Sequence, residues 1–319
     1  MVDCYRVIKG MCIVLNMIMY TLLLVMNYAS NNSSGILFGN KSIGQVARKY
    51  FIEFNPAPWA FDIWKLVNAW TALWILYSLS HIFRKRVPDV LSAFFFVFFT
   101  LATLSNMAWT QFMSWEFIKV TTGLNFGIMV FLYASLACSY SGLYKHRYYI
   151  SRLDFWVIHL LVNNGIAAYT TWITVAALRS LAVTITYFHG LKQELAVTIA
   201  LGILGVSIVV WFILENTVFK DDLLYTWTIY PVLIWVLAAS VIFQFNRVSR
   251  LNTVIMQALL AVSCTFFIGR IFLVLWRIVN KTCETRATID IAMSEIPQTS
   301  DATREQKYTD KTDNQGLVD

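Results

Sequence analysis

The segment LAVTIALGILGVSIVVWFILENTV, residues 195–218, decides the fold class of this chain. Glu215 is its one charged side chain, and a bilayer core about 30 Å thick needs about 20 apolar residues for one helical crossing. Similar apolar blocks, separated by loops, follow one another from residue 8 to residue 276. The chain is therefore predicted to be an all-α polytopic membrane protein with about eight transmembrane helices.

The composition agrees with this fold class. Of the 319 residues, 58% are hydrophobic and 13% are charged, which leaves no room for a large soluble domain. The net charge of +7 requires no nucleic-acid partner, because the loops that flank membrane helices are basic for topological reasons. The lipid bilayer is the predicted partner, and a homodimer stays open. The helices are predicted at residues 8–29, 58–83, 89–113, 118–143, 153–178, 195–218, 223–245 and 252–276.

The predicted topology places the N-terminus, residues 1–7, in the cytoplasm. The outer loop 30–57 carries acceptor triplets for N-glycosylation at Asn31, Asn32 and Asn40, and their use requires that this loop face the lumen or the exterior. The basic loops after the second and fourth helices then lie on the cytoplasmic side, as the positive-inside rule prefers. Glycosylation of this loop requires passage through the endoplasmic reticulum. The predicted location is therefore the endomembrane system or the plasma membrane rather than the mitochondrial outer membrane.

The first apolar block and the polar C-terminal segment are interpreted separately. The first apolar block is either a retained helix or a cleaved signal peptide, because Arg6 and Lys9 precede its apolar core. Its length favours the retained helix. Residues 277–319 are polar and lack apolar periodicity, so they are predicted to form a disordered cytoplasmic tail.

Ionisable groups inside a membrane are costly, so each one is a candidate for function. Asp62 and Lys65 are three residues apart and can meet on one face of their helix. Glu215, Arg270 and His159 are predicted at comparable depth on the cytoplasmic side. These three are interpreted either as a polar fastener between helices or as the site of a secondary transporter.

Motifs of soluble enzymes and metal proteins are missing from the sequence. There is no His-Glu-x-x-His, no Gly-x-Ser-x-Gly, no phosphate-binding glycine loop and no Cys/His cluster with metal spacing. We therefore predict no enzymatic activity, no catalytic residue, no metal site and no cofactor. An orphan membrane receptor is a further alternative, favoured by the glycosylated outer loop and the Thr-rich tail.

Two patterns of residues inside the predicted helices concern packing and ligands. Gly123 and Gly127 have the Gly-x-x-x-Gly spacing that lets a membrane helix approach a neighbour closely. Several of the 12 tryptophans lie deep, where an indole offers a large apolar area and one N–H group that needs a partner. Five deep tryptophans are predicted either to pack the bundle or to line a pocket for a flat hydrophobic ligand: Trp64, Trp70, Trp109, Trp172 and Trp211.

Three motifs carry a family resemblance. The second predicted helix begins with PAPWAFDIW at residues 56–64, and the third contains NMAW at residues 106–109. The fifth has Tyr169, Trp172 and Ala176 in a Tyr-x-x-Trp-x-x-x-Ala pattern. In this order and on these helices, the motifs resemble those of the TspO/MBR family, the translocator or tryptophan-rich sensory proteins.

This resemblance implies a fold and a ligand. It covers residues 8–180 as a five-helix bundle with a pocket beneath the first loop, and it leaves residues 181–276 as a three-helix extension. It implies that the pocket binds a hydrophobic ligand such as a porphyrin or a sterol, with a role in transport or sensing. The ligand-binding residues that it implies are Trp59, Trp64, Asn106, Trp109, Tyr169 and Trp172.

Overall fold

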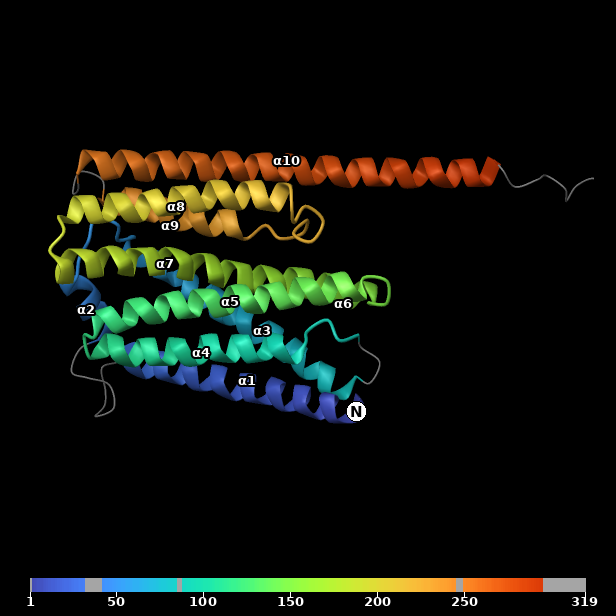
Figure 1. The fold of residues 1–319 in the computed structure, drawn as a ribbon, viewed down its shortest axis with the longest axis horizontal. Coiled ribbons are helices and arrows are strands. Elements are labelled where there is room, and N and C mark those ends of the chain that lie inside the picture. Colours follow the sequence, from blue (N-terminus) through green and yellow to red (C-terminus); the bar gives the residue numbers. More distant parts are fainter. Residues whose placement is uncertain (1, 32–41, 85–87, 245–248, 295–319) are drawn as a thin grey trace, which may run out of the picture. The chain divides into compact units, whose positions relative to one another are not determined.

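A computed structural model describes the backbone of residues 2–31, 42–84, 88–244 and 249–294. All regular structure in these ranges is helical (Figure 1). Seven helical stretches are long and apolar enough to cross a membrane, and a shorter apolar helix accompanies them. The prediction of an all-α polytopic membrane protein with about eight membrane helices is confirmed. The chain divides into two compact units, residues 1–267 and 268–319.

Each predicted membrane segment overlaps one of the longer helices of the structure. The short elements are two α-helices, the 3-10 helix η1 and the π-helix η2. In chain order the elements are α1 (Val2–Asn31), α2 (Ile43–Lys49), η1 (Pro58–Asp62), α3 (Ile63–Phe83), α4 (Ala93–Ser114), α5 (Ile118–His146), α6 (Arg152–Val157), η2 (Ile158–Asn163), α7 (Asn164–His189), α8 (Gln193–Asn216), α9 (Ile229–Gln244) and α10 (Arg250–Ser294).

The fifth membrane stretch is longer than predicted. It runs without a break through α6, η2 and α7, from Arg152 to His189. Its end is set by Gly190, whose φ of +71° places it in the left-handed region that glycine adopts without steric cost. The N–H of Leu191 then bonds back to the carbonyl of Ile185. The helix therefore stops where a glycine allows the chain to turn.

Helix α9 begins at Ile229 rather than at the predicted residue 223. Pro231 lies in the first turn of α9, where a missing N–H and a fixed φ do no harm. The side chain of Asn164, on α7, accepts hydrogen bonds at its Oδ1 from the backbone N–H groups of Trp227 at 2.9 Å and Thr228 at 3.3 Å. These bonds satisfy the backbone N–H groups just before α9 and so help to set where the helix begins. The apolar periodicity of the sequence could not reveal such contacts with another helix.

Helix α10 continues to Ser294, whereas the sequence predicts that a disordered tail starts at residue 277. The stretch 277–294 contains no glycine and no proline. A helix that already exists is extended at little cost by such residues, because nucleation is the expensive step. Residues 295–319 lie outside the described part of the chain.

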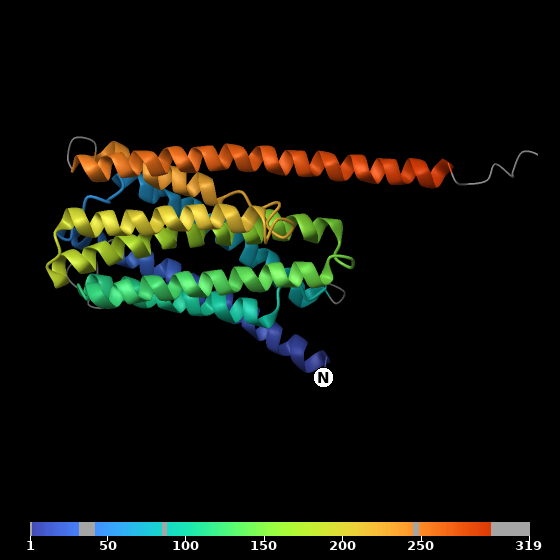
Figure 2. The same cartoon turned by 45° about the horizontal axis from the view of Figure 1, so that its top comes forward.

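Within the first unit, α7 is the central helix. It packs against α3 and α5 on one side and against α8 and α9 on the other (Figures 1 and 2). Small residues allow close packing here: a Cβ at Gly165 would lie 2.9 Å from Cδ1 of Trp70 on α3. Close contact through glycine is a general way of joining helices in membranes. The core of the unit therefore lies along α7.

The segment between α2 and α3 is held by helices far along the chain. Nε1 of Trp235, on α9, donates to the carbonyl of Ala60 at 3.0 Å, and the N–H of Ala57 donates to the carbonyl of Ala239 at 3.2 Å. The carboxylate of Glu53 accepts a hydrogen bond at 2.6 Å from Nδ2 of Asn252, on α10. The approach to α3 is thus positioned by α9 and α10, which lie beyond the sequence motifs at residues 56–64, 106–109 and 169–176.

Candidate functional site

Four of the six predicted ligand-binding residues meet in one place. The rings of Trp64 and Tyr169 lie edge to face, with centroids 5.5 Å apart, and Trp64 lies 6.3 Å from Trp172. The ring of Phe61 lies 5.7 Å from that of Trp172. Nδ2 of Asn106 donates a hydrogen bond to the hydroxyl oxygen of Tyr169 at 2.6 Å. These five residues, the aromatic cluster, join η1 and α3 to α4 and α7.

Local structure explains why these side chains converge. Pro58 is the first residue of η1, where its fixed φ favours the start of a helix. Since η1 leads directly into α3, Phe61 and Trp64 lie on adjoining turns. On α7, Tyr169 and Trp172 are three residues apart and share one face. Edge-to-face contact is a preferred geometry for aromatic rings, so the aromatic cluster is a stable arrangement.

The other two predicted residues lie apart from these ring contacts. Trp59 is 42% exposed, and its ring stands edge to face with that of Trp235 at 4.9 Å. Trp109 lies one helical turn along α4 from Asn106, and its buried indole N–H has no hydrogen-bond partner among the described residues. A buried donor without an acceptor costs free energy, and such a group calls for an explanation.

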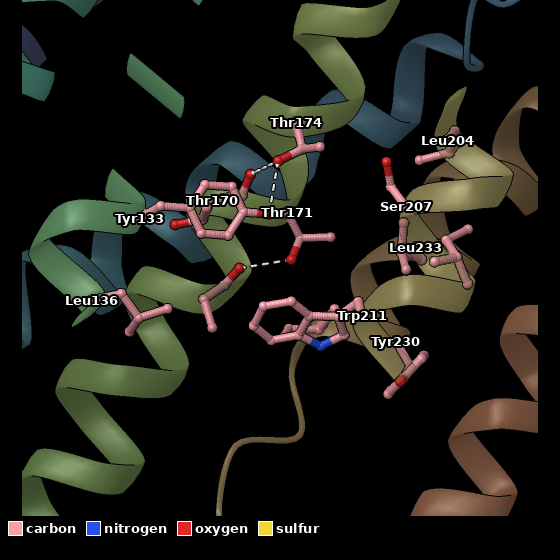
Figure 3. Close-up of a pocket in the computed structure, with 13 residues that line it drawn as sticks. Tyr133, Leu136, Thr170, Thr171, Thr174, Leu204, Ser207, Trp211, Tyr230 and Leu233 are labelled. Carbon is pink, nitrogen blue, oxygen red and sulfur yellow. Dashed lines mark hydrogen bonds between the residues drawn. The ribbon is translucent and has the colours of Figure 1, made fainter. Parts of the chain in front are cut away.

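A pocket of about 80 Å³ lies elsewhere, between α5, α7, α8 and α9 (Figure 3). It is lined by threonines of α7, by Tyr133 and by Trp211. Of the five deep tryptophans, Trp211 alone is among the residues that line it. Trp70 instead packs against Gly165. Sequence reasoning missed this pocket because its threonines and Ser207 carry no motif.

The charged residues that the sequence singled out have different surroundings. Nζ of Lys65 and Oδ1 of Asp62 lie 2.7 Å apart, which confirms that they meet on one face. The ring of His159 packs on Phe155 at 4.5 Å, and the carboxylate of Glu215 accepts a hydrogen bond from the hydroxyl of Tyr230.

Arg270 belongs to the second compact unit, residues 268–319, whereas His159 and Glu215 belong to the first. The grouping of His159, Glu215 and Arg270 stays a prediction. So does the interpretation of these residues as a transporter site.

An ion pair that sequence reasoning missed joins the end of α3 to α6. Arg84 donates from Nη1 and Nη2 to the two oxygens of Asp154, at 2.6 Å and 2.7 Å. Tyr77 and Ser151 donate to the same carboxylate, whose side chain is 2% exposed. The hydrogen bond with Asp154 raises the pKa of the Arg84 guanidinium. The available signal was Ser151-x-x-Asp154, a pattern typical of a helix start.

A comparison with protein families identifies the family of the chain. The family described as TSPO-like protein matches residues 13–272, which include the aromatic cluster and also α8 and α9. No curated protein and no solved structure matches the chain. Because the match covers most of the chain, it shows the family and not merely a local motif. The chain belongs to the family of TSPO-like proteins.

Proposed function

We propose that this membrane protein binds a flat apolar ligand, porphyrin- or sterol-like, at the aromatic cluster, and that binding serves transport or sensing. The observation that supports this most is the convergence of Trp64, Tyr169 and Trp172 from two distant helices. Ring faces and edges of this kind stack on flat ligands and supply much apolar contact area. The proposed role is binding rather than catalysis.

The exposure of the aromatic cluster favours lateral access from the bilayer. The side chain of Phe61 is 46% exposed, and Trp64 is half-buried, whereas Tyr169 and Trp172 are buried behind them. On a membrane-spanning stretch, the exposed apolar surface faces the bilayer. An apolar ligand dissolved in the bilayer would therefore meet Phe61 and Trp64 first.

A polar group of the ligand would find a donor on α4. The buried indole N–H of Trp109 has no partner among the described residues, one turn from Asn106. A carboxylate of a porphyrin or the hydroxyl oxygen of a sterol can accept such a hydrogen bond. Binding would then satisfy a donor that is costly to leave unpaired in a membrane.

Titration with protoporphyrin tests the aromatic cluster. We expect saturable quenching of tryptophan fluorescence in the purified protein, with an affinity that falls about thirtyfold or more in Trp64→Ala, because removing a central aromatic anchor costs at least about 2 kcal/mol. The change in porphyrin absorbance gives a second readout that does not depend on the number of tryptophans. A sterol is tested by competition: it is added to the protein with bound protoporphyrin, and its binding is measured as the loss of porphyrin binding.

The matched control is Trp115→Ala. Trp115 ends α4 outside the aromatic cluster, and its side chain is 50% exposed. Its loss should leave the affinity unchanged. Equal affinity of Trp64→Ala and the unaltered protein, in a variant that elutes as a folded protein, would contradict the assignment of the ligand to the aromatic cluster.

We further propose the endomembrane system or the plasma membrane as the location. The support is the three acceptor triplets; Asn31 is the last residue of α1, and Asn32 and Asn40 lie outside the described residues. Digestion with an N-glycosidase should increase the electrophoretic mobility of the protein from eukaryotic cells. The shift should vanish when all three asparagines are replaced by Gln. An unshifted protein would contradict both the glycosylation and this route.

A further inference from the structure

The pocket between α5, α7, α8 and α9 lies near the middle of three of the membrane-crossing stretches. Tyr133 is near the middle of α5, Thr171 is near the middle of the stretch 152–189, and Ser207 is in the central part of α8. All three line the pocket (Figure 3). The pocket and the aromatic cluster both use α7 but share no residue, since Thr170 and Thr171 line the pocket whereas Tyr169 and Trp172 belong to the aromatic cluster.

The threonine and serine hydroxyls that line the pocket already donate hydrogen bonds within their own helices. Oγ1 of Thr170, Thr171 and Thr174 donates to the carbonyl four residues earlier at 2.7, 2.8 and 2.8 Å, and Oγ of Ser207 does the same at 2.8 Å. A hydroxyl that donates in this way keeps its lone pairs for accepting. The oxygens of these threonines and of Ser207 can therefore accept a hydrogen bond from a donor on the ligand. The buried indole N–H of Trp211, which has no partner among the described residues, can donate one.

The pocket has an aromatic wall and opens towards lipid. The indole of Trp211 stands across the pocket from Thr171 (Figure 3). The rings of Tyr133 and Trp211 have centroids 6.5 Å apart, and Tyr133 is 39% exposed. Ser207 is exposed as well. Since these helices cross the membrane, the exposed side chains mark an opening to the hydrocarbon core.

Charge and size narrow the class of ligand. The 13 lining residues include no charged side chain, so the pocket offers no partner to a carboxylate, a phosphate or an ammonium group. The volume of about 80 Å³ is well below the roughly 150 Å³ of an engineered cavity that holds benzene. The pocket as it stands therefore admits a slim group and not a whole porphyrin.

We propose that this pocket binds the hydroxyl end of a neutral lipid alcohol that enters from the hydrocarbon core. An alcohol supplies a donor for the threonine and serine oxygens, its own oxygen can accept from the indole N–H of Trp211, and it carries no charge. In the hydrocarbon core a hydroxyl has no partner, so a hydrogen bond to Thr171 or Ser207 favours the bound state. The first carbons of the lipid lie against the indole of Trp211.

Photolabelling in lipid nanodiscs tests this proposal on the unaltered protein. The two probes are a diazirine-bearing hexadecanol and its methyl ether, which has the same chain but no donor. We expect the alcohol to label peptides that contain Tyr133 or Trp211 in a saturable way. Its labelling should be at least about fivefold stronger than that by the ether, because one hydrogen bond in a membrane contributes about 1 kcal/mol. Unlabelled hexadecanol should compete, and hexadecane should not.

Variants locate the hydrogen bond. Thr171→Val with Ser207→Ala removes two acceptors at nearly constant shape and should lower labelling by the alcohol to that by the ether. The matched control is Thr265→Val, because Thr265 also donates to the carbonyl four residues earlier, at 2.9 Å, but is exposed outside the pocket. Ala167→Leu should fill the pocket and abolish labelling by both probes.

Two results would overturn the proposal. Equal labelling by the alcohol and the ether would show that no donor is recognised. Labelling that does not saturate would show only lipid contact at an exposed surface. The porphyrin titration reports on the aromatic cluster, so failure at one site is distinguishable from failure at the other. Trp64→Ala should leave the labelling unchanged.

Discussion

Replacing Arg84 with Met is expected to lower the free energy of unfolding by about 3 to 5 kcal/mol, the cost of leaving a buried charge without its partner. The carboxylate of Asp154 is 2% exposed and receives both Nη groups of Arg84. In Arg84→Met, the hydroxyls of Tyr77 and Ser151 are the donors that the carboxylate keeps among the described residues. The measurement is SDS-induced unfolding of the purified protein, followed by circular dichroism.

A double-mutant cycle separates the ion pair from the loss of the Arg84 side chain. Asp154→Asn removes the buried charge and leaves Arg84, whose side chain is 41% exposed, able to reach water. The double variant Arg84→Met with Asp154→Asn should therefore be more stable than Arg84→Met alone. If the double variant were no more stable, the effect would come from lost packing by the arginine stem and not from the buried carboxylate.

The second large effect is expected from Gly142→Ala, which should destabilise the protein by about 3 kcal/mol, the upper end of typical overpacking costs. A Cβ at Gly142 would lie 1.9 Å from the carbonyl oxygen of Val90 and 2.7 Å from its carbonyl carbon. These are backbone atoms, so no side chain can rotate away. Val90 and Leu91 are themselves buried, and α5 or the segment before α4 must move.

Gly127→Ala is the matched control on the same helix. A Cβ at Gly127 would meet no atom within 4 Å, so alanine should be neutral or stabilise α5 by up to about 1 kcal/mol through its higher helix propensity. Both variants are compared by SDS-induced unfolding. A loss of stability in Gly142→Ala no greater than in Gly127→Ala would contradict the close approach to Val90.

These glycines show where a sequence motif misleads. Gly123 and Gly127 have the spacing predicted to let α5 approach a neighbour, yet a Cβ at either meets open space among the described residues. Among the described residues, the prediction of close approach at these two glycines is therefore wrong. The close approaches occur at Gly142 and Gly165, which belong to no recognisable pattern. The partner at each position, Val90 or Trp70, lies far away in the sequence.

The aromatic cluster could be predicted in large part from the sequence. Tyr169 and Trp172 share a face because they are three residues apart, and Trp64 follows η1 at a fixed distance from Pro58. The motifs of a known family then indicated that these faces meet. The contacts of Trp59 with Trp235 on α9 were not predictable, because the family resemblance was recognised only up to residue 180.

What the sequence alone determined is the membrane fold. The thickness of the hydrocarbon core sets the length of each apolar segment, whatever its neighbours are, so eight segments could be counted without a structure. Only the tertiary structure decided the start of α9, where Asn164 of α7 supplies acceptors to the backbone. It also decided the pocket at Thr171 and Trp211. These features depend on atoms of other helices, whose position the local pattern of a chain does not contain.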